Sequence, residues 1–197
     1  STWTDTAHTH PELVAHHYTE AGLVAQAIGY WQRAGLLAVE RSANQEAIRH
    51  FGTALQILRT LPAGADRDHQ ELALLMGLGV PLSVTVSWAA PEVRSANERA
   101  LELCRTLGES SQLFRALFGV WSNLQVQADY RAARPISEQL LTLSVHAQDD
   151  GLQLQAHRAN GILALHTGQF SDALHHCDAG MALYDPARHH AHVAQYW

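Results

Sequence analysis

The 197-residue chain is 47% hydrophobic and 16% charged, a composition that can bury a large core and excludes a disordered tail or a disulfide-stapled miniprotein. Its formal net charge is -6 and its basic residues are scattered singly, so we expect no nucleic-acid partner. No apolar stretch reaches the roughly 20 residues that a membrane-spanning helix needs, and no leader opens the sequence, so we expect a soluble, cytoplasmic protein without a membrane partner.

Helix start and stop signals follow one another along the chain. Pro11 and Glu12 open the first helix, and Gly22 closes it with the left-handed conformation that glycine favours. Pro81 is expected to kink or end its helix, and 82–86 alternates like a strand but has no partner strand, so it is interpreted as helix or loop. The predicted helices span about 11–22, 24–42, 44–61, 67–81, 91–108, 110–127, 130–147, 150–167 and 170–184.

The connections between these helices are short, and no linker rich in proline, glycine or serine divides the chain. We therefore expect one all-α domain over 1–197, with 1–10 flexible or tag-like and 186–197 as the start of a truncated next repeat. The expected fold is a right-handed superhelical array of antiparallel helix pairs, an α-α solenoid of about nine or ten helices.

A repeated spacing of small and apolar residues supports this fold. Small residues let two helices approach closely, and a large residue one turn away fills the notch between neighbouring pairs. The first copy of the pattern contains Ala15, Tyr18, Gly22, Ala27, Trp31, Ala34 and Leu37. The last copy contains Gly161, Ala164, Gly168, Ala173, Cys177, Gly180 and Leu183, and a more degenerate middle copy contains Trp121, Ala133, Ser137 and Leu140.

The order small, aromatic, glycine, alanine, aromatic, alanine in the first copy resembles the tetratricopeptide repeat (TPR). The last copy departs from that repeat at Ala164 and Cys177, where aromatic residues are usual. The period of about forty residues also exceeds the usual 34, which implies longer helices or loops.

A narrower resemblance involves 11–22, 30–35, 41–44, 89–93 and 183–186. These segments look like the C-terminal repeat region of bacterial signalling proteins that join a nucleotide cyclase domain and a P-loop ATPase domain to such repeats. The resemblance implies that the catalytic domains lie upstream, and that this chain is a non-catalytic fragment that regulates an attached enzyme.

Few residues suggest chemistry. All thirteen basic residues are arginines, which excludes Schiff-base and P-loop lysines, and no HExxH or GxSxG motif occurs, so we expect no enzyme and no cofactor.

Among fourteen histidines, His189, His190 and His192 are best placed for a metal, but no carboxylate or cysteine accompanies them, so no metal site is predicted. Cys104 and Cys177 belong to no CxxC pair and are expected to be small, reduced core residues.

The remaining candidate site is a helical face that the hairpin partners leave uncovered. Helical geometry places on that face Glu12, His16, Thr19, Arg115, Phe118, Ser122, Gln125, Arg158, Ile162 and His166. Either these residues line a groove for a peptide or helix, or they form a solvated face. The carboxylate-clamp repeats that hold chaperone tails place asparagine where this chain has His16, Ser122 and Ile162, and they use lysines, so chaperone-tail binding is not expected.

Three functions follow. The leading interpretation is a scaffold or sensor module that binds a protein or peptide partner, including upstream domains of the same parent chain, and regulates an attached signalling enzyme. The alternative is a receptor that holds a small-molecule effector within the superhelix. A stand-alone metal-binding or hydrolytic domain is disfavoured because its motifs are missing.

Overall fold

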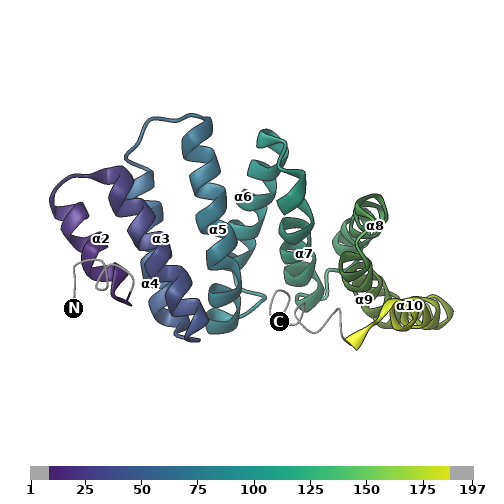
Figure 1. Ribbon diagram of the computed structural model, residues 1–197. Helices are drawn as coiled ribbons and strands as arrows, with labels where there is room; N and C mark the ends of the chain where they lie inside the picture. Colours follow the sequence, from purple (N-terminus) through teal and green to yellow (C-terminus); the bar gives the residue numbers. More distant parts are fainter. Residues whose placement is uncertain (1–8, 187–197) are drawn as a thin grey trace. The chain divides into compact units, whose positions relative to one another are not determined.

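The computed structural model describes residues 9–186, and these residues form helices and no strand (Figure 1). The helices are α2 (Pro11–Glu20), α3 (Val24–Glu40), α4 (Asn44–Leu58), α5 (Ala65–Val86), α6 (Pro91–Leu107), α7 (Ser110–Val126), α8 (Tyr130–Ala147), α9 (Asp150–His166) and α10 (Phe170–Leu183). The all-α prediction is confirmed, and most of the predicted boundaries hold to within two or three residues. Within the described range, no helix is both long and apolar enough to cross a membrane.

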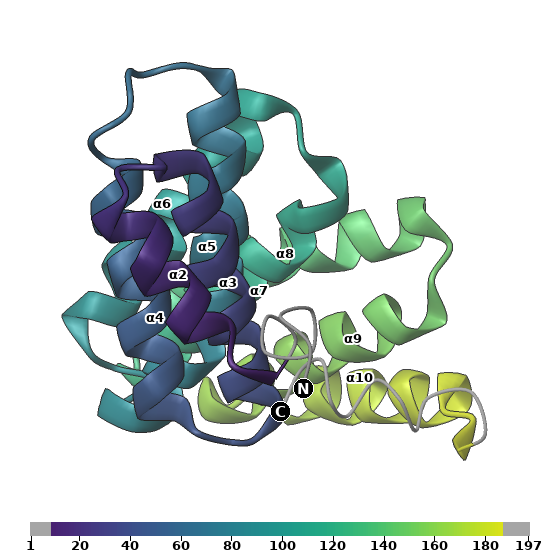
Figure 2. The same ribbon diagram turned by 60° about the vertical axis from the view of Figure 1, so that its left-hand side comes forward.

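The chain divides into two compact units, Ser1–Glu109 and Ser110–Trp197, which we call the first and second units. The first contains α2–α6 and the second α7–α10. Inside each unit every helix packs against the next helix of the chain, as Figure 2 shows for α2, α3 and α4. Short connections return the chain between neighbours, so each unit is a row of sequential helices of the kind the repeat pattern predicts. No composition change marks the boundary between the units.

Glycine ends the first helix of two hairpins, as expected. Gly22 and Gly168 have φ values of 68° and 75°, in the left-handed region where a side chain with a Cβ is strained. The chain then turns within three residues into α3 and α10, respectively. These local signals explain why the helix ends could be predicted from the sequence.

Pro81 does not end its helix, as one of the two expected outcomes had it, because α5 continues through it to Val86. Of the two interpretations of 82–86, helix and loop, the helix is confirmed. A proline inside a helix removes one backbone hydrogen bond and crowds the carbonyl four residues earlier, here that of Gly77. The side chain of Ser83 adds a local bond by donating to the Gly79 carbonyl at 2.7 Å. Pro81 and Ser83 are both buried, so packing of this turn outweighs the cost of the proline.

Most of the predicted packing residues lie in the interior of their unit. Ala15, Ala27, Ala34, Trp121, Ala133, Gly161, Ala173 and Gly180 are buried, Tyr18 and Trp31 are half-buried, and Gly22 and Gly168 lie in exposed turns. The prediction for Cys177 is wrong: Cys104 is buried, but Cys177 is exposed. The face of α10 that packs on α9 carries Ala173 and Gly180, and Cys177, one turn from each of them, is left exposed.

A tight slot at Phe51 holds three helices of the first unit together. The Phe51 side chain on α4 is fully buried. A Cβ atom added at Gly35 on α3 would lie 2.7 Å from the ring, and one added at Gly77 on α5 would lie 2.6 Å from it. Both glycines are therefore required for this ring to fit, a constraint that the sequence reading did not single out.

Candidate functional site

A polar pocket of about 140 Å³ lies in the first unit. Its lining comes from the end of α4, the beginning of α5 and the middle of α6. The lining side chains are Leu55, Leu58, Arg59, Arg67, Glu71 and Arg99. Three guanidinium groups thus share the pocket with one carboxylate, and we call it the arginine pocket.

Ordinary helix chemistry positions these side chains. Arg59 is the C-terminal cap of α4, where its backbone N–H still donates to the Leu55 carbonyl at 3.2 Å. Arg67 lies in the first turn of α5, and Glu71 follows it one turn later on the same helix. The turn 59–64 between α4 and α5 therefore brings two arginines to the same end of the helix pair.

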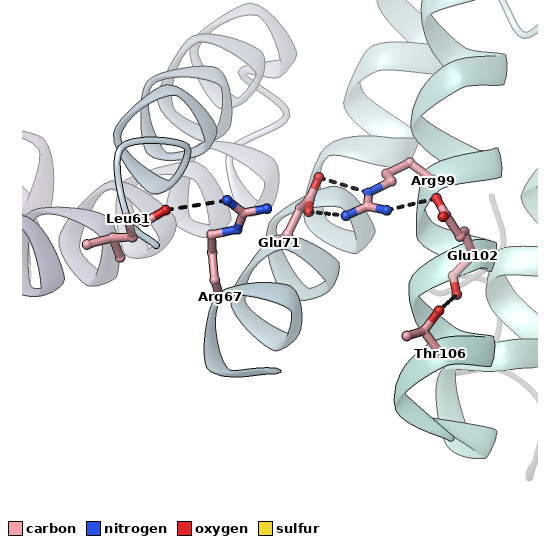
Figure 3. Close-up of polar contacts among 6 residues, drawn as sticks. All are labelled: Leu61, Arg67, Glu71, Arg99, Glu102 and Thr106. Carbon is pink, nitrogen blue, oxygen red and sulfur yellow. Dashed lines mark hydrogen bonds and ion pairs between the residues drawn. The ribbon is translucent and has the colours of Figure 1, made fainter. Parts of the chain in front are cut away.

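Arg99 on α6 holds the pocket wall in place through a two-pronged ion pair with Glu71 (Figure 3). Its Nε and Nη2 atoms donate to the two Glu71 carboxylate oxygens at 3.2 and 2.8 Å, and its Nη1 donates to Glu102 at 2.8 Å. The hydrogen bonds from Arg99 lower the pKa of Glu71, with Arg67 and Arg59 adding to the effect, and the same contacts raise the pKa of Arg99. At neutral pH this pair is fully ionised and joins α5 to α6.

The other two arginines retain unused donor capacity. Arg67 makes one long hydrogen bond, from Nη1 to the Leu61 carbonyl at 3.4 Å (Figure 3). Arg59 has no side-chain hydrogen bond or ion pair with any described residue, and it is exposed. Each guanidinium has five N–H donors in a planar fork that matches a carboxylate or phosphate.

The pocket is therefore suited to an anionic group. Its positive groups outnumber the single lining carboxylate, and that carboxylate is already paired with Arg99. Leu55 and Leu58 are buried and give the pocket an apolar base. A carboxylate or phosphate on an aliphatic stem would satisfy both parts of this lining.

The predicted groove residues of the first unit lie on α2. His16 and Thr19 are exposed on α2, and Glu12 is half-buried beside His10, with 3.1 Å between Glu12 Oε1 and His10 Nδ1. Thr19 accepts a hydrogen bond from the Trp31 indole at 3.0 Å. This last contact ties α2 to α3 and gives Thr19 a structural role.

In the second unit the structure brings two predicted groove residues together. The Arg158 guanidinium lies 5.1 Å from the centre of the Phe118 ring, a cation–π distance, and its Nε donates to Gln155 at 3.0 Å. Burial lowers the pKa of Arg158. Phe118 and Ser122 are only 8% and 9% exposed, so the structure corrects their predicted place on an open surface, because both belong to the packed face of α7.

The other predicted groove residues of this unit stay near the surface. His166 is exposed and its ring lies 5.3 Å from that of Tyr130. Arg115 is exposed, while Gln125 and Ile162 are half-buried.

A histidine pair joins α9 to α10 in the second unit. The Nδ1 atoms of His157 and His176 are 3.0 Å apart, so one ring donates to the other when both are neutral. Burial is the main cause that lowers the pKa of each, and neighbouring histidines lower both further. No group of three or more possible metal ligands occurs in the described range, and the predicted candidates His189, His190 and His192 lie outside it.

Sequence reasoning missed both the arginine pocket and the histidine pair. The pocket residues come from three helices, and their convergence depends on how α4, α5 and α6 rotate against one another. One available signal was the spacing of Arg67 and Glu71 by four residues, which places both on one side of a helix. That spacing does not reveal Arg99.

Comparison with known proteins gives one relative and no family. No family model matches the chain. The chain is 28% identical over 188 residues to an uncharacterized protein of Rhizobium meliloti (strain 1021), and the match covers 94% of this chain but 18% of that protein. The chain thus spans less than a fifth of the length of the relative.

Proposed function

We propose that this chain is a non-catalytic helical-repeat interaction module that binds an acidic segment of a partner protein at the arginine pocket. The observation that carries the proposal is the convergence of Arg59, Arg67 and Arg99 on one pocket that contains a single carboxylate. Paired guanidinium groups recognise carboxylates and phosphates with defined geometry. Stacked helices of this kind form extended surfaces that bind partner proteins.

The size of the pocket favours a protruding acidic group over an enclosed effector. Sites for whole small molecules usually enclose roughly 300–1,000 Å³, whereas this pocket holds about 140 Å³. A glutamate, aspartate or phosphorylated side chain fits that volume. The rest of the partner would lie across the surface around it, and so the protein partner is preferred to the small-molecule receptor.

The proposal extends to the protein that contains the module. The resemblance to repeat regions of cyclase and ATPase signalling proteins suggests that the module regulates an attached enzyme in the cytoplasm. The relative supports a modular arrangement, because a segment similar to this chain makes up 18% of that longer protein. Binding of an acidic segment at the pocket would then be coupled to the activity of the attached enzyme.

The experiment measures binding of a labelled, end-blocked peptide of glutamate residues by fluorescence anisotropy. The test variant is the double substitution Arg59→Gln and Arg67→Gln, which removes the two arginines with spare donors and leaves the Arg99–Glu71 pair intact. We expect the dissociation constant to rise about tenfold, equivalent to about 1.4 kcal/mol. Free citrate serves as the small-molecule probe.

The matched control is Arg41→Gln with Arg49→Gln, two exposed arginines of the same unit that do not line the pocket. It changes the net charge equally and should leave binding within about twofold. Equal losses in both variants would mean that net charge, and not the pocket, attracts the peptide. Binding of citrate as tightly as the peptide would favour the effector receptor instead.

A further inference from the structure

The arginine pocket contains two positive charges that the protein does not neutralise. Arg99 pairs with Glu71 and with Glu102, each at 2.8 Å, so its charge is compensated within the first unit. Arg59 and Arg67 line the same pocket, and neither forms an ion pair with a residue in the described range. A ligand group that carries two negative charges would match both guanidinium groups, whereas a single carboxylate would match one.

The two uncompensated guanidinium groups reach the pocket from different elements. Arg59 directly follows the last turn of α4, and Arg67 lies in the first turn of α5, so two separate donor forks share one small pocket. A carboxylate is planar, and its two oxygens are occupied by one fork. A phosphate monoester has three terminal oxygens and a charge of about −1.5 to −2 at neutral pH, so it can accept hydrogen bonds from two forks at once.

Aspartates beside the pocket favour a ligand whose charge is concentrated at one point. Asp66 and Asp68 flank Arg67 in the first turn of α5, but neither lines the pocket. A segment with carboxylates along its length would bring some of them near these aspartates, and like charges repel. A single phosphorylated side chain carries its whole charge into the pocket instead.

We propose that the acidic group recognised by the arginine pocket is a phosphorylated serine or threonine of the partner protein, held by Arg59 and Arg67 together. This inference rests on the proposed function, because it names the group that enters the same pocket. The short carbon stem that carries the phosphate would contact the apolar base formed by Leu55 and Leu58. A protein kinase that acts on the partner would therefore switch the interaction on.

The experiment compares labelled, end-blocked peptides of equal net charge by fluorescence anisotropy. One peptide has a single phosphoserine among alanine and glycine residues, the second has two adjacent glutamates in its place, and the third has an unmodified serine. Protein concentrations extend to roughly 1 mM, so that weak binding is measured. We expect the phosphoserine peptide to bind about tenfold more tightly than the diglutamate peptide, and the serine peptide not to bind.

Two variants test whether both donor forks read the phosphate. Arg59→Gln with Arg67→Gln should abolish the preference for phosphoserine. Arg67→Lys keeps the charge but removes the fork, and it should lower the preference to about twofold. The matched control is again Arg41→Gln with Arg49→Gln, which should keep the full preference because neither residue lines the pocket. Circular dichroism confirms that each variant is folded.

The possible outcomes separate this inference from the proposed function. Equal affinities for the phosphoserine and diglutamate peptides overturn the inference and leave binding of an acidic segment in place. If the peptide of glutamate residues also fails to bind, both proposals fall. A preference for phosphoserine that survives Arg59→Gln with Arg67→Gln overturns the inference, because another site then reads the phosphate. Inorganic phosphate that displaces the phosphoserine peptide as effectively as its unlabelled form also overturns it, because the pocket is then a site for the free ion.

Discussion

At the scale of single residues, the ring of Phe51 fits between two glycines of neighbouring helices in the first unit. Glycine inside a helix costs about 1 kcal/mol relative to alanine, so its use at Gly35 and Gly77 needs a packing reason, and the buried ring supplies one. Gly77→Ala would place a methyl group 2.6 Å from a ring that has no room to move. We expect a net loss of about 1–2 kcal/mol in the free energy of unfolding, measured by urea denaturation.

A matched glycine separates crowding from helix propensity. Gly29 lies in α3 with no atom near its would-be Cβ, so Gly29→Ala should stabilise the chain by up to about 1 kcal/mol. Phe51→Leu combined with Gly77→Ala should cost less than the two substitutions added together, because the smaller side chain leaves space for the methyl group. If Gly77→Ala stabilises the chain as Gly29→Ala does, the slot does not constrain this helix contact.

At the scale of helix pairs, the contact between α9 and α10 depends on neutral histidines. The pKa values of His157 and His176 are lowered in the folded chain, chiefly by burial, whereas in the unfolded chain they return to about 6.5. The unfolded state therefore binds more protons as the pH falls through that value, and the folded state loses stability. The melting temperature should decrease between about pH 7.5 and pH 5.5.

The double variant His157→Gln with His176→Gln measures how much of the fall in melting temperature is due to the histidine pair. Glutamine keeps a hydrogen-bonding group but does not titrate, so the melting temperature of the variant should fall less over the same pH range. His166→Gln is the control, because it removes an exposed histidine of the same unit and leaves the His157–His176 pair in place. Parallel pH profiles for the parent and the double variant would show that the pair does not control this stability.

At the scale of the whole molecule, the sequence predicted the features that depend on local chemistry, which are the helix ends and the order in which the helices pack. Helix ends at Gly22 and Gly168 follow from backbone conformation alone, and the repeated small residues indicated sequential packing. The sequence left 82–86 open between helix and loop, because the burial that lets α5 continue through Pro81 depends on packing against neighbouring helices and not on local chemistry. Cys177 shows the same limit, since periodicity identifies an apolar face but not whether another helix covers it.

The candidate site was less predictable than the fold for a related reason. Arg59, Arg67 and Arg99 lie on three helices, so their convergence depends on the rotation of each helix about its own axis. The groove prediction assumed that each helix packs in one direction and selected residues at fixed angles from that direction. This assumption agrees with the exposure of Arg115 and His166, but it placed the buried Phe118 on an open face, because α7 packs over a wider part of its surface.

The division into two units makes a prediction about cooperativity. The first and second units are each compact, and each has packing contacts among its own helices. Destabilising the first unit with Gly77→Ala should therefore speed hydrogen exchange mainly at the backbone amides of α3, α4 and α5. Exchange in α8, α9 and α10 should change little.

The reciprocal substitution makes the test symmetric. A Cβ added at Gly161 would contact His176 at 3.4 Å and the backbone of Ala173, so Gly161→Val should crowd the α9–α10 contact and speed exchange there while α2–α6 keep their protection. If each substitution speeds hydrogen exchange only in its own unit, the two units unfold independently. A partner bound at the arginine pocket would then change the stability of the first unit alone, unless it also contacts the second. Equal acceleration across both units by either substitution would show instead that the chain unfolds as one cooperative body, and a signal at the pocket could then reach α10 directly.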